Sequence, residues 1–416
     1  MWDAMISKPL IGYLLAALMA CLSACTSSEP PLEPAPEVSQ MTSPRAWHAL
    51  AVLPSGQVLV AGGSSHFGQN AFNEPTASAA LYDHATGSWT ATGSMSVERI
   101  HPSSVLLPSG KVLVAGGRSL RSPHLPCGLV RSSAELYDPD TGTFTVTGSM
   151  GTPRHGPAAV LLATGDVLAF GGWGDPDLSR AVVTASAELY HPETGTWTRT
   201  GDMVTAREGG SAATARLASG DVLVVGGTTS ISGCDPVALI ADAEIYSPAT
   251  GAWTRTQALD YVVAGASLTL LPSGNVLLVG GYTSACGENL CARIYDPGPG
   301  TWRAARPTNW SRDVAAAVRL PSGKVLVLGG TVSRPEGGVY GDLFDPATET
   351  WSTAKLLAYN HGNGARAALL PDGEVLITGG ILAARPTGPL IGSPGPDFGF
   401  GYWHVIDIAE RLHAPD

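Results

Sequence analysis

Short apolar runs recur along the chain, each placed between a tight-turn signal and a pair of glycines. The copy at 107–117, LPSGKVLVAGG, shows the pattern. Pro presets φ and Gly accepts a left-handed conformation, so Leu-Pro-Ser-Gly predicts a hairpin turn. The Val and Leu run that follows predicts a strand covered on both faces. The other copies lie at 53–63, 162–172, 217–227, 271–281, 320–330 and 370–380.

A second apolar phrase follows every copy except the last, as in AELYDPDTGTF at 134–144. Leu-Tyr predicts a third strand, Asp-Pro-x-Thr-Gly another tight turn, and the aromatic residue after it a fourth strand that packs on the neighbouring sheet. Its other copies lie at 79–89, 187–197, 243–253, 292–302 and 341–351. Seven four-stranded units with a period of about fifty residues predict an all-β, seven-bladed propeller.

The seventh unit departs from this pattern. After Gly380 come a long loop and the segment 402–416, which supplies a third strand and no fourth. The residues before Met41 hold the place that a fourth strand holds before Met95 in the next unit. We therefore expect residues 36–42 to close blade seven and to pair an edge that would otherwise be open.

The combination of an apolar strand, Gly-Gly, a spaced Tyr and then Trp resembles the kelch repeat. The motifs cover residues 41 to about 407. The resemblance extends to the central propeller of galactose oxidase and to its bacterial lipoprotein relatives, and it implies a kelch-type β-propeller over 41–416.

The N-terminus has the pattern of an export signal. An apolar run at 9–20 follows Lys8, is too short for a permanent membrane span, and precedes Leu-Ser-Ala-Cys ending at Cys25. This resembles the bacterial lipobox, so residues 1–25 are expected to be a signal peptide and Cys25 to carry the lipid. The alternative is an ordinary signal peptide with a chance cysteine. Residues 26–40 are rich in Pro, Ser and Glu and are expected to form a flexible tether.

The charge of the chain bears on which kinds of partner it can bind. Only 14% of residues are charged and the net charge is −11, which argues against a nucleic-acid partner. By family analogy, Thr26 after the lipid-bearing cysteine favours delivery to the outer membrane, with the propeller facing the periplasm or the cell surface.

Both tight turns of each unit are expected on one face of the propeller. The opposite face, which we call the loop face, carries the links after Gly-Gly and the links between blades. Links such as 64–78 and 118–132 vary strongly in length and sequence. Variable loops on a rigid scaffold are where binding usually occurs, so the loop face is the expected binding surface.

An arginine recurs on the loop face just before the innermost strand of most units. These residues are Arg45, Arg99, Arg154, Arg207 and Arg312. One interpretation is a ring of guanidinium groups that binds a carboxylate or an acidic sugar. The other is structural, with each arginine paired to an Asp, a Glu or a loop carbonyl of the next blade.

Copper chemistry of the galactose oxidase type requires a Tyr-His pair near an inner strand. Trp47-His48 and Ile100-His101 occupy similar places but supply no tyrosine, and Tyr190-His191 falls in a turn on the opposite face. Tyr359 and His361 are separated by one residue. The C-terminal domain that supplies a further ligand in that family is absent from this sequence. No metal or other cofactor is therefore expected.

Acid–base chemistry on sugars, as in propeller isomerases or lyases, is a second enzymatic interpretation. Its candidates are His48, His101, His155, Glu208 and His361. Asp175 and Asp177 are candidates for a Ca²⁺ site, with a plain acidic loop as the alternative. Trp173 and Trp403 are loop-face aromatic residues that are expected either to contact a ligand or to pack over the blades.

Two cysteines flank a short turn at the start of a strand. Cys286 and Cys291 are expected to form a disulfide in an oxidising compartment. The state of Cys127 and Cys234 stays open, because they would meet only if two loops leaned across blade three.

These patterns predict a monomeric, exported and lipid-anchored propeller that binds a protein or glycan partner through its loop face. Its candidate contacts are the five recurrent arginines, His48, His101, Trp173 and Trp403. The alternative is a carbohydrate-active enzyme that uses the same face.

Overall fold

The computed structural model describes residues 36–66, 74–119, 128–174, 182–232, 235–283, 291–309, 312, 316–330, 339–359, 361–383 and 403–413. They lie in one compact unit, Pro36–Asp416, and are built from strands, turns and links without a helix. Within these segments there is accordingly no helix of the length and apolar character that a bilayer crossing requires. The all-β prediction is confirmed.

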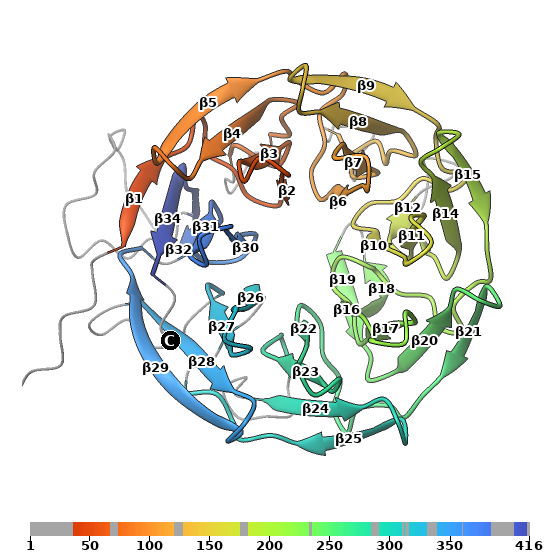
Figure 1. The fold of residues 1–416 in the computed structure, drawn as a ribbon. Coiled ribbons are helices and arrows are strands. Elements are labelled where there is room, and N and C mark those ends of the chain that lie inside the picture. Colours follow the sequence, from red (N-terminus) through yellow and green to blue (C-terminus); the bar gives the residue numbers. More distant parts are fainter. Residues whose placement is uncertain are drawn as a thin grey trace, which may run out of the picture. The chain divides into compact units, whose positions relative to one another are not determined.

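Seven four-stranded antiparallel sheets stand around a central axis (Figure 1). The innermost strand is the first of the sheet along the chain in blades one to six, and β30 in blade seven. Blade one consists of β2 (Ala49–Val52), β3 (Val58–Ala61), β4 (Ala79–Asp83) and β5 (Ser88–Thr92). Blade two consists of β6 (Ser103–Leu106), β7 (Val112–Ala115), β8 (Ala134–Asp138) and β9 (Thr143–Thr147). Blade three consists of β10 (Ala158–Leu161), β11 (Val167–Phe170), β14 (Ala187–His191) and β15 (Thr196–Arg199).

The next three blades repeat this order of strands. Blade four consists of β16 (Ala213–Arg216), β17 (Val222–Val225), β20 (Ala243–Ser247) and β21 (Ala252–Arg255). Blade five consists of β22 (Ser267–Leu270), β23 (Val276–Val279), β24 (Ala292–Asp296) and β25 (Thr301–Ala304). Blade six consists of β26 (Ala316–Arg319), β27 (Val325–Leu328), β28 (Val339–Asp345) and β29 (Thr350–Leu357).

Blade seven takes its outermost strand from the beginning of the chain. Its order is β30 (Arg366–Leu369), β31 (Val375–Thr378), β34 (Ile408–Leu412) and β1 (Glu37–Gln40). The pairing of β1 with β34 confirms the predicted closure. Because β1 begins at Glu37, the propeller begins before residue 41, where the sequence pattern had placed its boundary.

The closing strand is also fixed to blade one. The indole Nε1 of Trp89 donates to Ser39 Oγ at 3.1 Å. Met41 is buried in the cluster that joins blade seven to blade one, with Val58 and Leu376. The closure therefore buries apolar surface as well as pairing the edge strand.

The core lies between neighbouring blades. The second strand of each sheet is buried at all four positions, as its nearly continuous apolar run predicts. One cluster holds Leu59 and Ala61 of blade one together with Val112 and Val114 of blade two. Burying each Val or Leu side chain contributes about 1.5–3 kcal/mol, so each blade is stabilised by its two neighbours.

The glycine pair allows this close packing on the loop face. Gly62 and Gly63 have φ of 68° and 94°, which side-chain-bearing residues rarely adopt. A Cβ on Gly62 would lie 2.8 Å from the carbonyl oxygen of Arg99 in the next link between blades. The recurrent Gly-Gly therefore makes room for the recurrent arginine segment.

Three short ribbons rise from the links after the Gly-Gly pairs. They are β12 (Trp173–Gly174) with β13 (Val182–Val183), β18 (Thr228–Ser232) with β19 (Asp235–Leu239), and β32 (Ile381–Ala383) with β33 (Trp403–Val405). These ribbons give the variable links after the Gly-Gly pairs part of their structure; β12, β18 and β32 are labelled beside the inner strands in Figure 1.

Candidate functional site

The recurrent arginines are buried in the walls of the blades. The side chains of Arg45, Arg99, Arg154, Arg207 and Arg312 are at most 1% exposed. Each donates to the carbonyl oxygen of the first glycine of a Gly-Gly pair, at 2.8–3.0 Å. The structure thus brings these five residues to equivalent places in separate blades, with their guanidinium groups turned into the protein.

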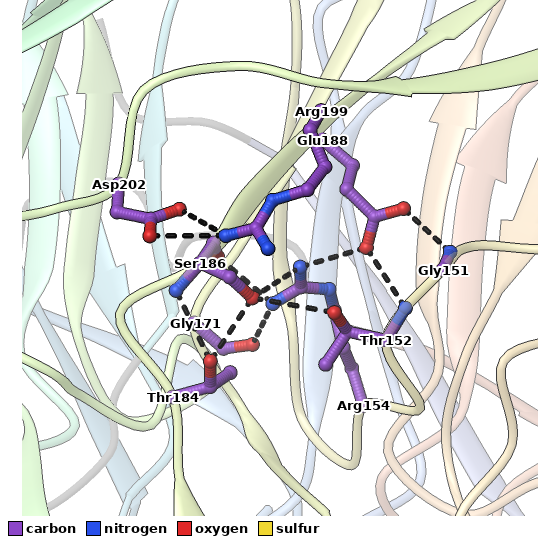
Figure 2. A network of polar contacts seen from close by, with 9 residues as sticks. All are labelled: Gly151, Thr152, Arg154, Gly171, Thr184, Ser186, Glu188, Arg199 and Asp202. Carbon is purple, nitrogen blue, oxygen red and sulfur yellow. Dashed lines mark hydrogen bonds and ion pairs between the residues drawn. The ribbon is translucent and has the colours of Figure 1, made fainter.

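Blade three shows the network in full (Figure 2). Arg154 donates to Gly171 O, Ser186 O, Ser186 Oγ and Glu188 Oε1 at 2.8–2.9 Å. Glu188 in turn accepts hydrogen bonds from the backbone N–H groups of Gly151 and Thr152. These contacts are of the structural kind, with a carboxylate and backbone carbonyls, but the partners lie in the arginine's own blade and not in the next one as expected. The ion pair ties the link before β10 to β14 of the same blade.

The carboxylate partner occupies the same register position in most blades. Glu135, Glu188, Glu244, Asp342 and Glu410 fill it. In blade seven His361 takes the place of the arginine: its ring nitrogens lie 2.9 Å from Gly379 O and 3.0 Å from Glu410 Oε1. His361 is thus part of the blade scaffold rather than of the channel mouth. The sequence indicates this role through spacing. His361 precedes the first glycine of its pair, Gly379, by 18 residues, and Arg45 precedes Gly62 by 17.

Blade one lacks the carboxylate. Ala80 fills the equivalent position on β4, opposite Val60. Arg45 bonds only to Gly62 and Ser78 in the described residues. Burial without a carboxylate lowers the pKa of Arg45 to about 10.

His48 is buried beneath the loop face. Its Nε2 lies 2.9 Å from Thr378 Oγ1, and its side chain is fully covered. Burial, followed by the nearby charges of Arg366 and Arg45, lowers the pKa of His48 well below its usual range. His48 is therefore neutral at physiological pH and joins blade one to blade seven.

A row of aromatic rings lies at the mouth of the central channel. Trp47 stacks on His101 with 5.0 Å between ring centroids and 26° between planes. His101 lies 4.8 Å from His155, which lies 4.4 Å from Trp173. Trp47 and His101 are partly exposed, whereas His155 and Trp173 are buried. We call these four residues the ring row.

Trp47 and His101 hold a backbone conformation that disfavours side chains. Their φ values are 55° and 54°, and the equivalent Gly156 and Gly265 have 56° and 71°. For a residue other than glycine this conformation costs about 1–2 kcal/mol. Strain of this kind clusters at functional sites. Since glycine fills the same position in other blades, the fold does not require Trp47 and His101, and a functional role is indicated.

A chain of backbone hydrogen bonds joins the links that precede the innermost strands; we call these joined links the collar. The N–H of His101 donates to Trp47 O at 3.1 Å, and the N–H of Gly156 donates to His101 O at 3.3 Å. Trp47 N donates to Gly364 O at 2.9 Å, and Gly210 N to Gly156 O at 2.6 Å. The collar therefore runs from blade seven through blade four and holds the ring row in position.

Glu208 lies at the end of the ring row. It is 7% exposed, and its Oε1 is 3.7 Å from His155 Nδ1. Burial raises the pKa of Glu208, against the opposing effects of His101, Ser211, Thr228 and Trp173. Burial, followed by the charge of His155, lowers the pKa of His101 well below its usual range. A carboxyl group with a raised pKa beside imidazoles is a suitable proton donor.

An open pocket of about 250 Å³ adjoins the ring row, since two of its lining residues, His48 and Pro102, directly follow Trp47 and His101 in the chain. Its wall is formed by the innermost strands of blades one, two, three and seven: His48, Leu50, Pro102, Ser103, Ser104, Pro157, Ala159, Arg366 and Ala367. Arg366 has a clear signal in the sequence, since the same place in other units holds Ala or Ser. Arg366 does not recur, so it does not belong to the pattern formed by the five other arginines.

The candidate copper donors do not converge. His48 contacts Thr378, and His361 contacts Gly379 and Glu410. His191 is the last residue of β14, and not part of the turn as expected from the sequence, and it contacts Asp166 and Thr198. In the segments that the structure covers, no group of three His, Cys, Asp or Glu side chains has the spacing of a metal site. These residues do not fit a copper centre.

Several other predicted positions are described only in part. Cys291 is buried and disulfide-bonded, while Cys286, its predicted partner, lies outside the described residues, as do Cys127, Cys234 and Cys25. Trp403 pairs with Ala383 in β33, and its side chain is not described. Asp175 and Asp177 also lie outside the described residues.

The repeats and their register define the chain as a kelch-type β-propeller. No family model matches it. Kelch-like protein 25 of Xenopus tropicalis is 27% identical over 181 residues, which is 43% of this chain and 27% of that protein. Spermatocyte protein spe-26 of Caenorhabditis elegans is 30% identical over 127 residues, which is 30% of this chain and 20% of that protein. The matches thus span about a quarter and a fifth of these relatives.

Two solved structures share the fold. A fungal alcohol oxidase of the AA5 family, in complex with copper, aligns with a TM-score of 0.68 and 19% identity over 92% of this chain and 77% of that one. The structure of YjhT aligns with a TM-score of 0.55 and 13% identity over 76% of this chain and 99% of that one. At such identities the likeness shows the propeller fold, in agreement with the kelch resemblance of the sequence.

Proposed function

We propose that this propeller is a binding module whose ligand is a carbohydrate held at the mouth of the central channel. The observation that carries the proposal is the ring row, in which Trp47 and His101 take left-handed positions that glycine fills in blades three and five. A sugar ring presents an apolar face that stacks on aromatic rings, and its hydroxyl groups suit polar groups such as Glu208.

The size of the site favours a small ligand. The pocket that adjoins the ring row measures about 250 Å³. Sites for drug-sized ligands are roughly 300–1,000 Å³, so this space suits a single sugar unit rather than a folded protein surface. A protein partner on the outer loops is the competing interpretation, and it does not require the ring row.

The test replaces the two strained residues by the one the repeat uses elsewhere. Trp47→Gly and His101→Gly remove the rings and relieve the left-handed strain. Both variants should therefore melt within a few degrees of the wild type. Sugar binding, measured by calorimetry against a monosaccharide panel, should fall at least tenfold.

Tyr282→Ala provides the matched control, because Tyr282 is a 59% exposed aromatic residue in a link of the same face. It should bind sugars as the wild type does. Unchanged binding in both glycine variants would exclude the channel mouth. Loss of binding only in Tyr282→Ala would move the ligand to the outer loops.

The enzymatic alternative rests on the close approach of His155 and Glu208. A buried carboxyl group with a raised pKa can donate a proton to a sugar oxygen. Incubating bound sugars with the protein and following them by NMR tests this alternative. Turnover that Glu208→Gln abolishes while binding persists would make the protein an enzyme.

The membrane anchor belongs to the same proposal. Lipidation at Cys25 would tether the propeller to the outer membrane and leave the loop face free to meet glycans of the envelope or the surroundings. The export pattern of the sequence supports this part of the proposal.

A further inference from the structure

Arg366 departs from the repeat at the wall of the channel cavity. It is the first residue of β30 and pairs with Thr378 of the second strand. The same register position in the other six innermost strands is filled by Ala49, Ser103, Ala158, Ala213, Ser267 and Ala316. Six small residues show that the fold needs no long side chain here, so the arginine serves something other than the blade.

The charge of Arg366 has no carboxylate opposite it in the described part of the chain. Its Nε donates to His48 O at a long 3.4 Å, and none of the ion pairs between described residues includes it. The buried Arg154, by contrast, lies 2.9 Å from Glu188. Arg366 is thus a cation in the cavity wall without a counter-ion of its own.

The surroundings of Arg366 are consistent with this uncompensated charge. Arg366 is exposed to solvent, and the protein atoms packed around the channel lower its pKa by desolvation. Its charge also contributes to the lowered pKa of His48 and of His101, which keeps both imidazoles neutral. Among the described residues that line the pocket, the guanidinium of Arg366 is therefore the one charged group.

We infer that Arg366 binds the carboxylate of an acidic sugar whose ring lies against the ring row. This inference rests on the proposed function. A guanidinium group offers two parallel N–H donors, which match the two oxygens of one carboxylate. A phosphate dianion would bring a second charge for which the cavity wall has no second cation. The other arginines of the innermost strands, Arg216 and Arg319, end their strands near the opposite face and donate to Leu161 O and Leu270 O.

The experiment compares acidic sugars with their neutral counterparts by calorimetry. The probes are galacturonate and glucuronate against galactose and glucose. The wild type should bind the uronates at least tenfold more tightly. Arg366→Ala should abolish the preference, so that uronates and neutral sugars bind with the same affinity. This variant should fold, because Ala occupies the equivalent position in four blades.

Arg319→Ala is the matched control, since it removes a channel arginine at the far end of an innermost strand. It should keep the preference for uronates. A preference that persists in Arg366→Ala would overturn the inference, and so would equal binding of uronates and neutral sugars by the wild type. That second result would leave the proposed function intact, whereas no binding of any sugar would remove both. Tighter binding of inorganic phosphate than of uronate, lost in Arg366→Ala, would overturn the assignment of a carboxylate.

Discussion

At the scale of single residues, the most informative positions are those where one blade differs from the rest. Arg45 has Ala80 where five other blades have a carboxylate, and Arg366 stands where the other blades have Ala or Ser. A position shared by all blades serves the blade, because each repeat must solve the same packing problem. A position that differs in one blade is therefore the better guide to a ligand or to a local weakness.

The missing carboxylate of blade one predicts a stabilising substitution. Ala80→Glu places a carboxylate where Glu188 lies in blade three, within reach of Arg45 and of the backbone that follows Met41. Hydrogen bonds to charged groups contribute about 1.5–3 kcal/mol each. We expect the free energy of unfolding, measured by chemical denaturation, to rise by about 1 kcal/mol or more.

The reverse substitution provides the comparison. Glu188→Ala leaves Arg154 buried without its partner and should cost about 3–5 kcal/mol. An Ala80→Glu variant that is less stable than the wild type would show that blade one has no room for the carboxylate.

His48 predicts how the fold responds to acid. Its pKa is lowered in the folded state, so below about pH 6.5 the unfolded chain binds a proton that the folded protein does not. The free energy of unfolding therefore falls with falling pH, by about 1.4 kcal/mol per pH unit for this one group. His48→Gln should reduce that slope between pH 6.5 and 5 in denaturation curves. Parallel curves for the two proteins would contradict the assignment.

At the scale of elements, β1 is the strand with the largest consequence. It pairs with β34 and supplies Ser39 to Trp89. Deleting residues 26–42 should lower the melting temperature markedly, because blade seven then exposes an edge and the cluster around Met41 loses its cover. Differential scanning calorimetry measures the effect. Deleting only 26–34 is the control and should leave the melting temperature unchanged.

The elements were the part of the structure best predicted from the sequence. The phrase around 107–117 marks two strands and their turn in every blade, because hairpin turns and doubly covered strands have local signatures. The two-residue strand β12 was not predicted, since nothing in its sequence distinguishes it from a loop.

At the scale of the whole molecule, the number of repeats in the sequence predicts the seven-bladed propeller, but it does not predict which side chains meet in the ring row. His101, His155 and Glu208 were candidates as single residues, but their meeting with Trp47 and Trp173 depends on the geometry of the collar. The sequence supports two interpretations of the recurrent arginines, because it does not show which way a side chain points. Cys25 and the Cys286–Cys291 pairing remain predictions.

The pairing of β1 with β34 has a consequence for how the protein is made. Glu37 and Arg411 are neighbours in the sheet but are separated by 374 residues of chain. During synthesis or export β1 emerges first and β34 last, so β1 can pair only after nearly the whole chain has emerged. Joining contacts so distant slows folding, and it leaves an exposed edge until the two strands pair. Once joined, the array of repeats has no free end from which to fray.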